Sequence, residues 1–140
     1  MRCVLDTDVV VAGMRSPTGA SAALLRAARE GQATLVLTVA LAMEYEAACS
    51  KAEHRIASGL SEGEADIFLT TLIALAELVE THFLWRPQLR DPGDEMVLEA
   101  AVNGRANALV TFNVRHFGTV PSHFGIEVLR PRDAIGRIRK

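Results

Sequence analysis

The sequence has 140 residues, the length of one ordinary domain, and its 49% hydrophobic and 23% charged residues exclude a disordered chain. Its net charge of −2 argues against a strong non-specific grip on nucleic acid, although carboxylates that bind a metal would be hidden in this count. We therefore expect a single domain over residues 1–140 with one hydrophobic core.

Cysteine usage and the longest apolar runs bear on the cellular compartment. Cys3 and Cys49 stand in no metal-ligand spacing, as is typical of small buried hydrophobic residues in a reducing compartment. No apolar run reaches the ~20 residues that a membrane helix requires, and the N-terminus carries no signal-peptide pattern. We expect a soluble, cytoplasmic protein that has no membrane partner.

Short apolar runs alternate with helical patterns along the first half of the chain. The first run stops abruptly at Asp6, and Thr38 is placed to cap a helix after the second run. Ser61 and Glu64 have the spacing of a capping box, which opens the longest helix. In chain order we expect a strand at 2–5, a helix at 20–30, a strand at 34–37, a helix from 38 to about 49 and a helix from 61 to about 80.

The second half continues this alternation. A DPGD sequence at 91–94 favours the start of a helix, and Pro131 suits the first turn of a closing helix. In chain order we expect a weak strand at 82–85, a helix at 91–104, strands at 108–111 and 126–129, and a short helix within 130–140. Strands that alternate with helices predict an α/β fold in which a parallel sheet lies between helical layers.

Polar side chains follow the predicted strands at the edge where such sheets carry their sites. Asp6 and Asn113 come directly after strands, Asp94 opens a helix, and Glu44 lies in the helix after the second strand. Each has an ordinary structural explanation, namely a turn or helix cap for three of them and a solvated helix face for Glu44. Their shared edge of one sheet favours a common site.

The chemistry of such a site is that of a hard cation. Several carboxylates cannot stay ionised side by side without a counter-charge, and oxygen ligands select Mg²⁺ or Mn²⁺. Such an ion activates water for attack on a phosphodiester. A serine nucleophile has less support, because Ser16, Ser21 and Ser58 have no evident His and acid partners.

Four motifs occur in a fixed order: VLDTDVV at 4–10, EYE at 44–46, DPGD at 91–94 and LVTFN at 109–113. As a set, together with HFLWRPQLRD at 82–91, they resemble the PIN-domain nucleases over essentially the whole chain. Within that superfamily the sequence is similar to the VapC-type toxins of bacterial toxin–antitoxin pairs.

The resemblance implies a three-layer α/β/α sandwich with a parallel sheet of about five strands. It implies a Mg²⁺- or Mn²⁺-dependent endoribonuclease that cleaves RNA and is occluded by a protein antitoxin. By motif, Asp6, Glu44 and Asp94 become metal-binding carboxylates, and Asn113 stands where many relatives carry a fourth acid. Supporting roles are open for Asp8, Asp91, Glu95 and Thr111, and the cations that could position the RNA backbone are Arg15, Arg86 and Arg115.

Two features depart from the family's pattern. Asp8 stands where Asn is common, and the neutral Asn113 puts a second metal ion in doubt. Which of Asp91, Asp94 and Glu95 binds metal stays open, with Asp94 favoured because it best fits the acid that opens the helix in the family's motif.

Three alternatives remain. A binding module without turnover is favoured by Asn113 and the negative net charge. A DNA nuclease is the second, because the sequence shows no reader of the 2′-hydroxyl. A haloacid-dehalogenase-type phosphatase fits the Asp6-Thr-Asp8 motif, but its later Lys and acidic pair should follow Thr111, whereas the acidic cluster 91–95 precedes it.

The predicted helix at 61–80 carries more apolar width than one core-facing stripe requires. The surplus suggests a protein interface, either in a homodimer or with the antitoxin. Burial of both faces within the domain is the alternative.

Overall fold

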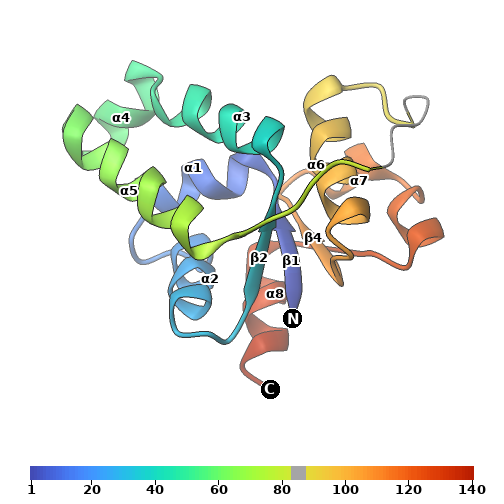
Figure 1. The fold of residues 1–140 in the computed structure, drawn as a ribbon. Coiled ribbons are helices and arrows are strands. Elements are labelled where there is room, and N and C mark those ends of the chain that lie inside the picture. The colour runs from blue at the N-terminus through green and yellow to red at the C-terminus, as the bar shows by residue number, and fades with distance from the viewer. Residues whose placement is uncertain (83–87) are drawn as a thin grey trace.

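The structure, a computed structural model, describes residues 1–82 and 88–140 and is built around a five-stranded parallel sheet (Figure 1). The strands are β1 (Arg2–Leu5), β2 (Thr34–Leu37), β3 (Glu77–Leu78), β4 (Ala108–Val110) and β5 (Glu127–Leu129). Their order is β3-β2-β1-β4-β5, and each neighbouring pair is parallel. The chain winds from β1 toward one edge and later returns to the other side of β1. This makes the boundary between β1 and β4 the switch point, where sites form in such sheets.

Helices cover both faces of the sheet. Figure 1 shows α1 to α5 on one side and α6 and α7 on the other, and α8 packs against α2. The α-helices are α1 (Thr7–Arg15), α2 (Ala20–Arg29), α3 (Val39–Cys49), α4 (Ala52–Ser58), α5 (Glu62–Leu75), α6 (Pro92–Asn103), α7 (Val114–Phe117) and α8 (Pro131–Ile138), and a short 3-10 helix, η1, spans Pro121–Phe124. The predicted α/β sandwich with a parallel sheet of about five strands is confirmed.

The two central strands are buried on both faces. Cys3, Val4 and Leu5 of β1 and all of β4 are inaccessible to solvent, as the continuous apolar runs of a covered parallel sheet predict. Helix α6 packs directly against this sheet and ends at Gly104. A Cβ at Gly104 would lie 2.0 Å from Val36 Cγ1, so the close approach of the helix end to β2 requires glycine.

The third strand lies earlier in the chain than the sequence suggested. Helix α5 ends at Leu75 rather than near residue 80, and Ala76 has extended backbone. β3 follows at Glu77–Leu78 and pairs with β2, and Val79 N donates to Leu37 O over 2.9 Å. The backbone groups of residues 77–79 find hydrogen-bond partners at the free edge of β2, so they do not need to continue α5. The predicted strand at 82–85 lies largely outside the described residues.

Helices α1, α4 and α7 and the 3-10 helix η1 were not anticipated. Helix α1 begins immediately after β1, because Asp6 caps it by accepting a hydrogen bond from Thr7 N. Helix α4 ends at Gly59, which adopts a left-handed conformation. Within residues 1–82 and 88–140, none of the helices combines the length and the apolar character that crossing a membrane requires.

Candidate functional site

Asp6 lies at the junction of β1 and α1 and is 8% exposed. Its Oδ1 accepts a hydrogen bond from Thr7 N, and its Oδ2 accepts one from the Thr111 hydroxyl, both over 2.7 Å. Thr111 is fully buried at the end of β4, which pairs directly with β1. The neighbouring strand therefore fixes the orientation of the Asp6 carboxylate.

Asp8 joins the first turn of α1 to the loop after β4. Its Oδ2 accepts hydrogen bonds from Phe112 N over 3.2 Å and from Asn113 Nδ2 over 3.0 Å. Asn113 N in turn donates to the Thr111 hydroxyl over 2.9 Å. A neutral amide at position 113 thus complements Asp8, where a carboxylate at the same place would repel it.

The N-terminus of α6 carries three further acids of the predicted site, Asp91, Asp94 and Glu95. Asp91 caps this helix through hydrogen bonds from Gly93 N and Asp94 N. Asp94 Oδ2 lies 3.3 Å from His116 Nδ1 of α7. Sequence reasoning missed His116; the only signal was an imidazole three positions after Asn113, and the pairing with Asp94 depends on the fold.

The carboxyl groups of Asp6, Asp8 and Asp94 influence one another. Burial, followed by the charge of Asp6, raises the pKa of Asp8 to about 6. Burial also raises the pKa of Asp6, although hydrogen bonds from Thr111 and Thr7 oppose it. The pKa of Asp94 is raised by burial and then by the charges of Asp91 and Asp6. Ionising all three together is therefore costly, and a cation between them would relieve that cost.

The donor set fits a hydrated hard cation. In the part of the chain that the structure describes, no three His, Cys, Asp or Glu side chains stand close enough to enclose a metal ion. Mg²⁺, however, keeps several waters and is often held by only one or two carboxylates. Among the residues that the structure describes, the buried Oδ1 of Asp8 has no hydrogen-bond partner, so it offers an unused anionic oxygen. This oxygen and the raised pKa values together fit Mg²⁺ or Mn²⁺ with water completing the shell.

Two acids of the predicted site lie outside this group. Glu44 is half-buried on α3, and among residues 1–82 and 88–140 its carboxylate has no hydrogen bond or ion pair. Its neighbour Tyr45 is buried and donates its hydroxyl to the carbonyl of Leu5, which anchors α3 beside β1. Glu95 is buried, and its carboxylate accepts hydrogen bonds from Gln88 N and Leu89 N. Glu95 therefore holds the segment that leads into α6.

Two clefts flank the carboxylates. The Arg115 cleft has a volume of about 620 Å³, and Asp91, Asp94 and His116 line it together with Arg90 and Arg115. The Phe112 cleft has a volume of about 570 Å³. Its lining includes Thr7, Asp8, Arg15, Lys51, His54 and Phe112. Of the three predicted substrate-binding arginines, Arg15 and Arg115 thus adjoin the acids, and Arg86 lies outside the described residues.

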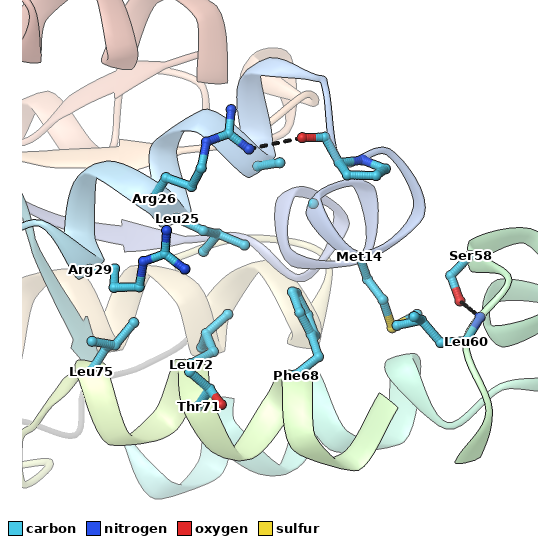
Figure 2. A pocket seen from close by; sticks show the side chains of 13 residues that line it. Met14, Leu25, Arg26, Arg29, Ser58, Leu60, Phe68, Thr71, Leu72 and Leu75 are labelled. Atoms are coloured by element: carbon cyan, nitrogen blue, oxygen red, sulfur yellow. Dashed lines mark hydrogen bonds between the residues drawn. The ribbon is translucent and has the colours of Figure 1, made fainter. Parts of the chain in front are cut away.

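A third concave surface, the apolar groove, has a different character. It has a volume of about 380 Å³ and lies among α1, α2 and α5. Figure 2 shows Met14, Leu25, Phe68, Leu72 and Leu75 around it, with Arg26 and Arg29 beside them. No carboxylate is among its lining residues, so the groove is suited to binding rather than to hydrolysis.

Comparison with protein families assigns the sequence to a known group. Residues 2–115 match the family model described as PIN domain, and this range contains Asp6, Asp8, Asp94 and Asn113. No curated protein and no solved structure matches the chain. The family match covers well over half of the 140 residues, and the chain belongs to the PIN domain family.

Proposed function

We propose that this PIN domain is a Mg²⁺- or Mn²⁺-dependent endoribonuclease that hydrolyses RNA phosphodiesters. PIN domains are generally nucleases, so the broad class follows from the family, whereas the metal and the RNA substrate are the finer proposal. The observation that carries it is the group of Asp6, Asp8 and Asp94, whose pKa values are all raised at the carboxyl edge of the sheet. We also propose that residues 1–140 form one domain, because α8 packs back on α2.

The proposed roles follow from the contacts of each residue. A bound divalent ion supplies an activated water and neutralises charge on the phosphate. Asp6, held by Thr111, and Asp94, paired with His116, are the proposed ligands, and Asp8 adds an anionic oxygen beside them. Glu44 remains the third ligand that the resemblance implies, and it needs a test of its own because no contact ties it to the other acids.

RNA is proposed as the substrate mainly through the resemblance. Arg15 and Arg115 lie in the two clefts next to the carboxylates, where they could bind phosphates on either side of the cleaved bond. Because Arg86 was predicted for the same role, Arg86→Ala should be tested with them.

We further propose that the protein is the toxin of a toxin–antitoxin pair and that a protein partner covers the apolar groove. Support comes from apolar side chains of α5 that stay partly exposed to solvent. Leu75 is 38% exposed and Phe68 is half-buried. Arg26 and Arg29 beside them favour an acidic, amphipathic partner segment. A second copy of the chain is the other candidate occupant of the groove, and light scattering on concentrated protein tests it. If the parent protein is a dimer that Leu75→Glu dissociates, the second copy covers the groove. If the parent protein is a monomer, the antitoxin stays the proposed partner.

A binding module without turnover is the second candidate function, because Asn113 leaves the site with one acid fewer. A haloacid-dehalogenase-type phosphatase has less support. Both oxygens of Asp6 already accept hydrogen bonds, from Thr7 and Thr111, which makes this carboxylate a poor nucleophile.

The test is cleavage of labelled RNA, both unpaired and hairpin, by the purified protein with Mn²⁺, with Mg²⁺ and with EDTA. We expect cleavage with either ion and none with EDTA. Asp6→Asn should reduce the rate at least about 100-fold, because metal-assisted charge stabilisation contributes several kcal/mol. Glu44→Gln tests the third ligand against Glu46→Gln, an exposed residue on the same helix. If Asp6→Asn cleaves RNA as fast as the parent protein, the binding module replaces the nuclease.

A further inference from the structure

The Phe112 cleft has the composition of a nucleotide-binding surface and opens directly beside the carboxylates. Asp8 belongs both to this cleft and to the acidic group, since the charges of Asp6 and Asp94 act on it. A strand whose phosphate lay at the acids would therefore place its next nucleotide in this cleft.

The charges in the cleft favour a phosphate at its outer part. Arg15 and Lys51 are exposed there, and a guanidinium nitrogen of Arg15 lies 3.3 Å from His54 Nδ1. The anions that face these cations are Asp8 on the inner side and Glu53, whose carboxylate lies 3.7 Å from His54 Nε2 and is 80% exposed. Two permanent positive charges thus gather at one place in a protein whose net charge is −2.

Phe112 has a hydrogen-bonded backbone and an aromatic ring that is open to solvent. It is 45% exposed, although the adjacent Thr111 is fully buried. Its backbone N donates to Asp8 Oδ2, and its neighbours Thr111 and Asn113 hydrogen-bond to Asp6 and Asp8. The network that orients the acids therefore also fixes the backbone from which this ring projects.

We propose that the Phe112 cleft binds one unpaired nucleotide of an RNA strand, with its base stacked on Phe112 and its phosphate near Arg15 and Lys51. The proposal rests on the nuclease function above and adds a nucleotide-binding site beside the carboxylates to it. Every base has a face that can stack on an aromatic ring, so this contact selects for strandedness rather than for sequence. Bases inside a duplex are already stacked on each other and cannot reach the ring.

The binding experiment uses fluorescence anisotropy with a short unpaired oligoribonucleotide and a duplex of the same sequence. Asp6→Asn serves as the background so that the RNA stays intact, and the parent protein in EDTA provides a second condition. Phe112→Ala should weaken binding of the unpaired strand about 5- to 50-fold and that of the duplex less than about 2-fold. Phe112→Trp should retain the affinity. Phe124→Ala is the matched control, because Phe124 is 46% exposed and is not among the residues that line either cleft.

Salt dependence tests the phosphate contact separately. Each contact to a single strand contributes about 0.7 to the slope of the logarithm of the binding constant against that of the salt concentration. Lys51→Ala should make this slope shallower by about that amount, whereas the control Arg132→Ala on α8 should not change it.

The outcomes separate this proposal from the nuclease function. If the parent protein cleaves RNA with Mn²⁺ but Phe112→Ala binds unpaired RNA as tightly as Phe124→Ala does, the nucleotide site is wrong and the nuclease stands. An equal loss for unpaired and duplex RNA also overturns it. Selective loss of unpaired RNA binding supports the site even if the parent protein proves unable to cleave.

Discussion

One helix, α1, contributes to both the acidic edge of the sheet and the apolar groove. Each surface costs the folded protein free energy as long as nothing is bound to it. Helix α1 carries Asp8 in its first turn and Met14 near its end. At the edge, three carboxyl groups have raised pKa values because burial and neighbouring charge oppose their ionisation. In the groove, the cost is apolar surface left in contact with water.

The acidic edge and the apolar groove thus lack different kinds of partner. At the edge, the ionised carboxyl groups repel one another, which a bound hard cation would relieve. The groove lacks apolar contacts, which another protein segment would supply. If this is correct, substitutions should separate the two surfaces even though α1 connects them.

The largest expected effect is a loss of RNA cleavage when the acidic edge, but not the groove, is substituted. Asp94→Asn should lower Mn²⁺-dependent RNA cleavage at least about 100-fold, because it removes a proposed ligand. Leu75→Glu should change the rate less than about 2-fold, since this partly exposed side chain lines only the groove. Thermal unfolding checks the same contrast: Mn²⁺ should raise the melting temperature of the parent protein and of Leu75→Glu more than that of Asp94→Asn. Equal responses of the two variants would contradict the expectation that the edge and the groove act separately.

A second test restores an acid at the edge. Asn113→Asp should lower the Mn²⁺ concentration that gives half-maximal cleavage several-fold, because another carboxylate offsets the dehydration of the ion. Without metal, the same variant should be less stable by roughly 1–2 kcal/mol, since the new charge faces Asp8 Oδ2. Metal titrations of cleavage and of melting temperature measure both effects.

The control for this substitution is Asn107→Asp at the other end of β4. Its side-chain oxygen accepts a hydrogen bond from Arg2 N over 2.8 Å, which a carboxylate can also do. A similar change in metal requirement for Asn107→Asp would mean that added charge alone, rather than its place, causes the effect.

The smallest expected effect is the pH dependence of Asp8. Its pKa is raised from 3.8 to about 6 on folding, so the folded state holds this proton more tightly than the unfolded state. Its ionisation therefore reduces stability as the pH rises from about 4 through about 6. Asn does not titrate, so the unfolding free energy of Asp8→Asn relative to the parent should increase by roughly 1–2 kcal/mol over this window, measured in EDTA by denaturant unfolding. A difference that stays constant with pH would contradict the raised pKa.

The local sequence pattern determined most of the fold and gave the first candidate residues for the site. Asp6 follows an apolar run, DPGD favours a helix start, and alternating strands and helices imply a parallel sheet whose carboxyl edge carries the site. The fold was predicted correctly because strand ends and helix caps depend on residues close together in the chain, whereas the site at this edge stays a prediction. The end of α5 and the position of β3 could not be found in this way, since they depend on the distant edge of β2.

Only the tertiary structure decided which side chains meet. Thr111 reaches Asp6 across 105 positions, and Asn113 turns its amide toward Asp8 rather than taking the place of an acid. His116 approaches Asp94 because α7 and α6 lie on the same side of the sheet. Glu95 matched the same acidic motif as Asp94, yet the next position of a helix points about 100° away, and its carboxylate binds backbone amides instead. Composition and spacing indicate that acids gather at one edge, but hydrogen bonds between distant segments determine the direction in which each carboxylate points.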